Sequence, residues 1–271
     1  MPDKYDIGSV LEAGLDTLGY GDTPACFYPT GLTRLDGYII GLTPGMYGLI
    51  VGEDGLGKST IALSAMLHTK TPTTLLSTED GNDVVASRLL SMVSGVPEKL
   101  IRRNSLDARD RRHVMQALEL VKRRDIRVYF PHSAESTLRS VEDALKAGTK
   151  MLWLDYVQSV ASEEAEIAVF LREWKMLLHK YRAAGVLLAQ FKKSSKHIDK
   201  KTGKRVTAVR DKEDVRGSSL LYQKARFIGV LAKGEHDPNK IFMNLEKLSY
   251  DEPVPSLLFT RDAKTGMIEQ R

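Results

Sequence analysis

Short hydrophobic runs alternate along this chain with longer stretches in which apolar residues recur every three or four positions. The first run, residues 46–51, is followed by a glycine-rich turn and then by the apolar stretch 61–67. A short continuous run is typical of a buried strand, and the longer periodicity is typical of an amphipathic helix. We expect further strands at 128–130, 151–154 and 186–189, and further helices at 106–124, 140–147 and 167–182. This alternation predicts an α/β fold with a mainly parallel central sheet flanked by helices.

The N-terminal segment carries one apolar stripe at helical spacing, which ends at Gly19. The stripe consists of Ile7, Val10, Leu11, Leu15 and Leu18. Residues 19–29 are rich in turn formers and predict a linker. We therefore expect a short helical arm over residues 1–28 and one larger domain over residues 29–271. The arm either folds back on its own domain or docks on a neighbouring subunit, and the sequence favours neither.

Composition narrows the class of protein. The chain has 271 residues, 42% of them hydrophobic, as in ordinary globular proteins. Its one cysteine, Cys26, excludes an internal disulfide and a thiolate-rich zinc site. No apolar run approaches the roughly 18 residues that span a membrane, and no signal peptide is recognisable, so we expect a cytoplasmic protein. The net charge of +5 favours a polyanionic partner.

The residues after the first strand match the phosphate-binding pattern G-x-x-x-x-G-K-[ST]. They are Gly52, Glu53, Asp54, Gly55, Leu56, Gly57, Lys58, Ser59 and Thr60. Glycines let successive backbone N–H groups turn toward a phosphate, and the helix that follows points its positive end at the same place. We expect Lys58 to reach the β- and γ-phosphates of ATP and the Ser59 hydroxyl to hold Mg²⁺.

Three further strands end in polar side chains. Asp155 follows a buried run, and we expect it to hold Mg²⁺ together with Ser59, because ligands bind at the carboxyl ends of parallel strands. Glu79 ends another strand and is the expected catalytic base, with Asp80 as the competitor. Gln190 ends a third strand, where a neutral amide can contact the γ-phosphate and report its loss.

A basic segment follows Gln190 directly. The residues that we expect to contact DNA are Lys192, Lys193, Lys196, Lys200, Lys201, Lys204, Arg205 and Arg210. The segment has few aromatic residues, so we expect it to follow the phosphate backbone of single-stranded DNA without reading sequence. The alternative is a solvated loop that binds nothing.

These motifs occur in the order of a known family. Residues 29–36 and 41–45, with the phosphate-binding loop, resemble the opening of the RecA-like ATPase domain of DnaB-type replicative hexameric helicases. Residues 74–80 resemble that family's second strand, which ends in a catalytic glutamate. Residues 151–158 resemble its Walker B strand with the trailing Tyr-x-Gln, and residues 214–218 resemble its later Asp-x-Arg segment. The resemblance extends from about residue 29 to the C-terminus.

The resemblance implies an ATP-dependent DNA helicase that acts in replication and moves on single-stranded DNA as a ring. In that family the ring is a hexamer, the polarity is 5′ to 3′, and a linker helix docks on the neighbouring subunit. The expected source is a prokaryote or a phage. No primase or primase-binding domain is recognisable before the ATPase motifs, so a separate primase or other replication proteins are expected partners.

The family also carries a Lys-x-Arg motif that reaches the neighbouring subunit's γ-phosphate. Lys247 matches its lysine, but Ser249 stands in the arginine's place. Either the register of this loop is shifted, or another arginine substitutes, with Arg226 and Arg261 as candidates, or activation in trans is weak.

Two other functions compete with this interpretation. A RecA- or RadA-like recombinase filament would need a second DNA-contacting loop after Asp155, but residues 159–167 are short and acidic. A regulatory, clock-type ATPase would bind no DNA, and the basic segment argues against it.

Overall fold

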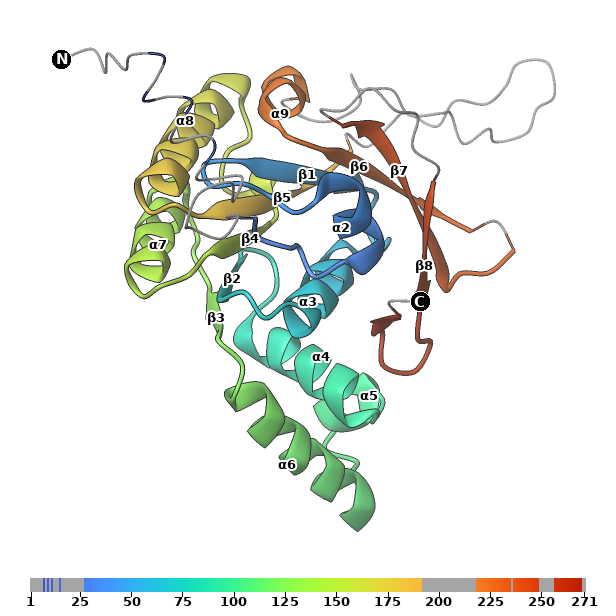
Figure 1. The fold of residues 1–271 in the computed structure, drawn as a ribbon. Coiled ribbons are helices and arrows are strands. Elements are labelled where there is room, and N and C mark those ends of the chain that lie inside the picture. Colours follow the sequence, from blue (N-terminus) through green and yellow to red (C-terminus); the bar gives the residue numbers. More distant parts are fainter. Residues whose placement is uncertain are drawn as a thin grey trace.

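A nine-stranded sheet in the order β3-β2-β4-β5-β1-β6-β7-β8-β9 forms the centre of the computed structural model (Figure 1). The structure describes residues 27–191, 218–234, 236–248 and 256–269, together with Ile7, Ser9, Leu11 and Leu15. The strands are β1 (Tyr47–Gly52), β2 (Thr73–Ser77), β3 (Ile126–Tyr129), β4 (Met151–Asp155), β5 (Ala184–Gln190), β6 (Ile228–Lys233), β7 (Lys240–Lys247), β8 (Leu257–Arg261) and β9 (Ile268–Glu269).

The helices in the described ranges are α2 (Thr33–Ile39), α3 (Lys58–His68), α4 (Asn82–Ser94), α5 (Glu98–Arg102), α6 (Ala108–Lys122), α7 (Ala134–Lys146), the 3₁₀ turn η1 (Val157–Ser159), α8 (Glu164–Lys180) and α9 (Ser218–Lys224). One hydrophobic cluster joins the sheet to α2, α3 and α4, and a second joins its other face to α7, α8 and α9. Both faces are therefore covered, as Figure 1 shows.

Coverage of both faces explains the continuous apolar runs of the sequence. Every residue of β1 is buried, with Ile50 in one cluster and Leu49 and Val51 in the other. From β3 to β6 all neighbouring strands are parallel, and from β6 to β9 they are antiparallel. The predicted α/β fold with a mainly parallel sheet is confirmed. The parallel order also brings the carboxyl ends of β1, β2, β4 and β5 to one edge.

The helix expected at residues 140–147 was placed too late. Helix α7 begins at Ala134, because Ser133 caps it: the Ser133 side chain accepts a hydrogen bond from the Ser136 N–H, and the Ser136 hydroxyl oxygen accepts one from the Ser133 N–H. A Ser-x-x-Ser pair is a weaker sequence signal than Ser followed by Glu or Gln. The antiparallel strands β7 to β9 were not predicted individually.

In the N-terminal segment, the described residues Ile7, Ser9, Leu11 and Leu15 are helical. The side chains of Ile7, Leu11 and Leu15 are exposed, and a spacing of four residues is the spacing of one helical face. Within the described residues, no helix has the length and hydrophobicity needed to cross a membrane.

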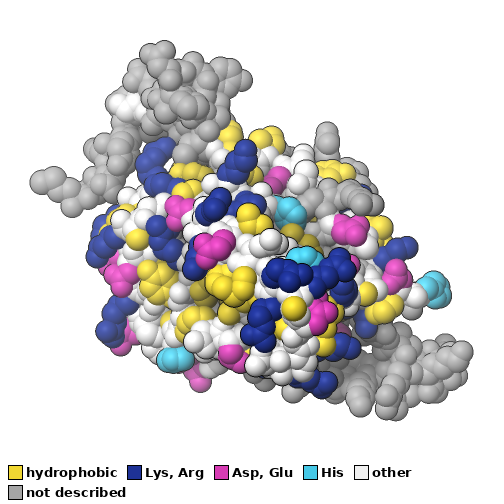
Figure 2. All heavy atoms as spheres, turned by 90° about the horizontal axis from the view of Figure 1, so that it is seen from below, with side chains coloured by type: hydrophobic (Ala, Val, Ile, Leu, Met, Phe, Trp, Pro, Cys, Tyr) yellow, Lys and Arg dark blue, Asp and Glu magenta, His cyan; other side chains and the backbone are white. Residues whose placement is uncertain are grey.

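Helix α6 projects from the body of the domain (Figure 1) and has one buried residue, Ala117. The face seen in Figure 2 carries basic side chains interspersed with acidic and hydrophobic ones, not one continuous basic patch. On α6 itself, Lys122 pairs with Glu119. These features are typical of a solvated face, which is how we interpret the charged stretch at 106–124.

Candidate nucleotide-binding site

The loop between β1 and α3 has the backbone that a phosphate-binding loop requires. Gly55 and Gly57 have φ angles of 77° and 87°, a region that side chains disfavour and glycine adopts readily. Helix α3 begins at Lys58, and the Ile61 N–H donates to the Gly57 carbonyl at 2.8 Å. The first N–H groups of a helix lack intrahelical acceptors and carry partial positive charge. The loop therefore offers backbone donors to an anion.

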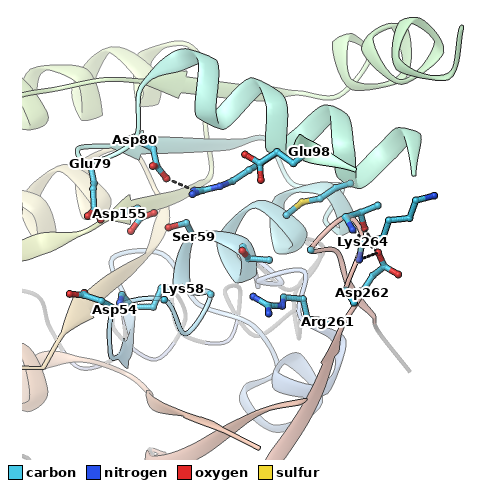
Figure 3. Close-up of a pocket in the computed structure, with 18 of the residues that line it drawn as sticks. Asp54, Lys58, Ser59, Glu79, Asp80, Glu98, Asp155, Arg261, Asp262 and Lys264 are labelled. Carbon is cyan, nitrogen blue, oxygen red and sulfur yellow. Dashed lines mark hydrogen bonds and ion pairs between the residues drawn. The ribbon is translucent and has the colours of Figure 1, made fainter. Parts of the chain in front are cut away.

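A cavity of about 500 Å³ lies over this loop (Figure 3). Its floor is the loop itself, and one end is formed by the last residues of β4 and β5 and by the residues that follow β2. Helices α4 and α5 and the turn at 262–266 form its sides. Its volume lies within the range of roughly 300–1,000 Å³ that is usual for small-molecule sites.

Lys58 is buried beneath the cavity. Its Nζ donates to the carbonyls of Gly52 at 3.0 Å and Glu53 at 2.9 Å. Burial lowers the pKa of the Lys58 ammonium, and the nearby carboxylates of Asp155 and Asp54 oppose that effect. A cation is thus held at the point where a phosphate would meet the loop.

Asp155 closes β4 and is almost completely buried. Its carboxylate accepts a hydrogen bond from the Ser59 side chain. Burial raises the pKa of Asp155 to about 6, although the Ser59 hydrogen bond and the Lys58 charge lower it in part. The hydroxyl and the carboxylate are hard oxygen ligands in contact, and Mg²⁺ usually takes one or two protein oxygens together with substrate phosphates and water. The pair fits Mg²⁺ bound with a nucleotide.

Nothing in the described part of the chain suggests a metal site independent of nucleotide, because no three or more His, Cys, Asp or Glu residues gather there in a metal-binding arrangement.

Glu79 is exposed to the cavity, two residues beyond the end of β2. The preceding Thr78 donates to the Asp155 carbonyl through its N–H at 2.9 Å and its hydroxyl at 2.8 Å. These bonds fix Glu79 beside Asp155, and Figure 3 shows both at the same end of the cavity as Asp80. Asp80 is engaged in an ion pair with Arg88. Of the two carboxylates, Glu79 is therefore the one available to act as a base.

Gln190 lines the same cavity at the end of β5, beside Gly52 in the sheet register. The side chain of Gln158, from η1, holds its backbone: Nε2 donates to the Gln190 carbonyl at 3.0 Å, and the Gln190 N–H donates to Oε1 at 3.1 Å. Gln158 belongs to the Tyr-x-Gln motif after β4, and no role was predicted for its side chain. These two hydrogen bonds, which we call the Gln158 clamp, hold the backbone of Gln190 in place. The position from which the Gln190 side chain extends into the cavity is therefore fixed.

The three candidates for a trans-acting cation lie in different places. Arg261 lines this chain's own cavity at the end of β8. Lys247 lies outside that lining and donates to the carbonyls of Tyr222 at 3.1 Å and Gln223 at 2.9 Å, near the end of α9. The Arg226 N–H donates to the carbonyl of Tyr47, at the end of β1 remote from the loop. Of these three candidates, Arg261 alone lines this chain's own cavity.

The expected DNA contacts lie outside the described residues. They are Lys192, Lys193, Lys196, Lys200, Lys201, Lys204, Arg205 and Arg210, and Ser249 is also outside.

The side walls of the cavity were not predicted; they are formed by Arg88, Met92 and Glu98 and by the turn at 262–266. The turn does carry a local signal. The Asp262 carboxylate accepts hydrogen bonds from the Thr265 N–H and hydroxyl, both at 2.7 Å, and Asp followed by Gly266 is typical of such a turn. No local pattern indicates that the turn faces the phosphate-binding loop.

The protein family described as the DnaB-like helicase C-terminal domain matches residues 28–248. The replicative DNA helicase DnaB of Leifsonia xyli subsp. xyli is 30% identical over 177 residues, which are 60% of this chain and 38% of that protein. A probable plasmid replicative DNA helicase of Chlamydia muridarum is 23% identical over 258 residues, 87% of this chain and 55% of that protein. The chain thus spans about half or less of these curated relatives.

Solved structures share the fold. An ATPase domain superimposes with a TM-score of 0.79 at 19% identity, covering 98% of this chain and 99% of that one. A DnaB-like replicative helicase, described with its interactions with primase, gives 0.76 at 17% identity over 98% and 67% of the two chains. The RadB recombinase gives 0.60 at 16% identity over 88% and 97%. The architecture is therefore that of RecA-like ATPases.

Proposed function

Because the chain belongs to the family of DnaB-like helicase C-terminal domains, we propose that it is an ATP-driven motor that moves along single-stranded DNA in replication. The observation that carries the proposal is the convergence of Lys58, the Ser59–Asp155 pair and Glu79 on one cavity. Phosphoryl transfer to water requires neutralisation of phosphate charge and a residue that positions the water. This cavity offers both.

The chain's own groups have separate roles in hydrolysis. Lys58 exchanges its backbone carbonyl partners for oxygens of the β- and γ-phosphates. Ser59 and Asp155 hold Mg²⁺, which supplies charge neutralisation at the phosphates when it is bound. Glu79 orients the attacking water and accepts its proton, since its carboxylate is exposed to the cavity while that of Asp80 is paired.

Gln190 connects nucleotide state to DNA. Its side chain contacts the γ-phosphate, and the basic segment 192–210 begins two residues later. Loss of that phosphate releases the Gln190 side chain, and this change is passed to the start of the segment. Lysine and arginine side chains there bind the DNA phosphate backbone, which gives sequence-independent and salt-sensitive binding.

The active assembly is a ring, a hexamer with 5′ to 3′ movement as the family resemblance implies. The helical residues Ile7, Leu11 and Leu15 expose an apolar face, and docking on a neighbour would stabilise the ring by about 1.5–3 kcal/mol for each side chain fully buried. The neighbour's cation comes from Arg226 or Lys247, since both lie outside the cavity lining, while Arg261 acts within its own subunit. A primase is the proposed partner, as in the related structure described with primase.

Steady-state ATP hydrolysis with and without single-stranded DNA tests the proposal. Lys58→Ala should lose nucleotide binding, because it removes the buried cation. Glu79→Gln should keep binding and lose turnover by about 10²–10⁴-fold, the usual contribution of a positioned base. Asp83→Asn is a matched control, since Asp83 is an exposed carboxylate on α4. Turnover by Glu79→Gln at the wild-type rate would remove Glu79 from the mechanism.

A further inference from the structure

An ion pair between Asp80 and Arg88 forms part of the wall of the nucleotide cavity. The Arg88 guanidinium, on α4, donates to the Asp80 carboxylate, and a dashed line marks this pair in Figure 3. Both residues line the cavity, with side chains 28% exposed for Arg88 and 22% for Asp80. A cation that faces a phosphate-binding cavity is therefore held by one of the protein's own carboxylates.

A hydrogen bond from the end of β2 holds the backbone of Asp80 in place. The Ser77 hydroxyl donates to the Asp80 carbonyl at 2.8 Å, and Ser77 is paired with Asp155 in the sheet. Asp80 also follows Glu79 directly. The pair consequently connects α4 to the turn that carries the proposed base, at the end of the cavity where Figure 3 places Glu79 and Asp155.

A guanidinium binds carboxylate and phosphate oxygens with the same planar, two-pronged geometry. A triphosphate seated on the loop would bring its terminal phosphate to the end of the cavity marked by Glu79, Asp155 and Gln190. That phosphate carries more negative charge than a carboxylate. A diphosphate would lack the group that reaches this end.

We propose that Asp80 is a latch on Arg88: it holds the guanidinium in the absence of a triphosphate and yields it to the terminal phosphate when a nucleoside triphosphate binds. The proposal rests on the proposed nucleotide-binding function. Asp80 acts here as a positioning residue, because it touches Arg88 and not the nucleotide. The consequence is discrimination. Because the pair must break when a triphosphate binds, its presence weakens the binding of a triphosphate and leaves the binding of a diphosphate unaffected.

Calorimetric titration with Mg²⁺ and the non-hydrolysable triphosphate AMP-PNP, and separately with Mg²⁺ and ADP, measures this discrimination. A partly exposed ion pair contributes on the order of 1 kcal/mol, which corresponds to about a fivefold change in Kd. Asp80→Asn removes the charge that holds Arg88 and keeps the size of the side chain. It should tighten AMP-PNP binding about fivefold and change ADP binding less than about twofold.

A double-mutant cycle with Arg88→Gln separates the latch from simple charge repulsion, because Asp80→Asn also removes a negative charge near the phosphates. If Asp80 acts through Arg88, its substitution has no effect on AMP-PNP affinity in the Arg88→Gln background. Equal tightening in both backgrounds, equal tightening for ADP and AMP-PNP, or no tightening at all would each overturn the latch.

Folding of each variant is checked by circular dichroism and thermal unfolding, and Asp80→Ser replaces Asp80→Asn if the latter does not fold. The same titrations distinguish failure of the latch from failure of the proposed nucleotide-binding function. Wild-type protein that binds neither nucleotide contradicts the proposed function. Wild-type protein that binds both, with no differential effect of Asp80→Asn, contradicts the latch alone.

Discussion

The side-chain amide of Gln158 hydrogen-bonds both backbone groups of Gln190, at 3.0 and 3.1 Å. Gln158 lies on η1, directly after the Walker B strand β4, and Gln190 ends the neighbouring strand β5. The residue that we propose as the γ-phosphate sensor is therefore held by the loop that follows Asp155, the proposed Mg²⁺ ligand. The proposed sensor and the proposed metal ligand are thus connected through one loop.

Gln158→Leu should uncouple DNA from hydrolysis. Leucine is similar in size but leaves the Gln190 N–H and carbonyl without these partners, at a cost of about 1–3 kcal/mol for each group that stays buried. We expect DNA stimulation of ATPase activity to fall several-fold while ATP affinity stays near wild type. Gln116→Leu, on the exposed face of α6, is the control. Unchanged stimulation in Gln158→Leu would show that the clamp has no part in coupling.

Asp155→Asn should stabilise the nucleotide-free protein at neutral pH. Burial raises the pKa of Asp155 from 3.8 to about 6, so the folded state holds this proton more tightly than the unfolded state. The free energy of unfolding therefore falls as pH rises from about 4 to 6. Above pH 6 the total decrease in the free energy of unfolding stays at roughly 3 kcal/mol.

Urea denaturation in EDTA, at several pH values, measures this effect. The asparagine variant should be more stable than wild type by about 2–3 kcal/mol near pH 7.5, and the difference should shrink toward zero near pH 4. A difference that does not depend on pH would mean that the Asp155 carboxyl group is not the cause.

Ile40 occupies a backbone position that suits glycine. Its φ angle is 59°, it caps the C-terminal end of α2, and its side chain is 61% exposed. A branched side chain in this left-handed region costs about 1–2 kcal/mol. Ile40→Gly should raise the free energy of unfolding by about 1 kcal/mol, since the loss of glycine's chain entropy offsets part of the gain. Ile40→Ala keeps the Cβ atom and should gain less; equal gains would exclude backbone strain as the reason.

Neutralising Lys200, Lys201, Lys204 and Arg205 should weaken single-stranded DNA binding and reduce its salt dependence. Each lost phosphate contact lowers the slope of log K against log salt by about 0.7. The matched control removes the same charge elsewhere, by neutralising Arg111, Arg112, Lys122 and Arg123 on and beside α6. Equal changes of slope in the two variants would assign the effect to net charge and not to the basic segment.

The central part of the fold could be predicted from the sequence because its signals are local. The run at 46–51, the glycines that follow and the helix at 61–67 specify a phosphate-binding loop within 22 consecutive residues. Asp155 ends one buried parallel strand and Glu79 lies two residues beyond the end of another, and parallel strands place their carboxyl ends at one edge. Their convergence on Lys58 follows from topology alone.

The cavity walls could not be predicted in this way. Arg88 and the turn at 262–266 are far apart in the sequence and meet only because α4 packs beside α3 and because β8 and β9 extend the sheet. The antiparallel strand β7 does carry a period-two pattern in Ile241, Met243 and Leu245. Its partner β8 follows a segment rich in proline and acidic residues, at 251–255. Such a segment does not indicate a hairpin, so the pairing of β7 with β8 was not predicted. Asp80 precedes α4, the helix that carries Arg88, so no helical spacing in the sequence indicates that the two residues pair. Asp80 therefore remained a competing candidate for the catalytic base.

The measurement that tests the central claim most directly is displacement of a labelled strand from a DNA duplex with one single-stranded tail. The account predicts displacement by the 271-residue chain that requires ATP and Mg²⁺, occurs on a duplex with a 5′ tail on the strand along which the motor moves, and is abolished in Glu79→Gln. ATP hydrolysis that is stimulated by single-stranded DNA, yet displaces no strand from either a 5′- or a 3′-tailed duplex, would contradict it.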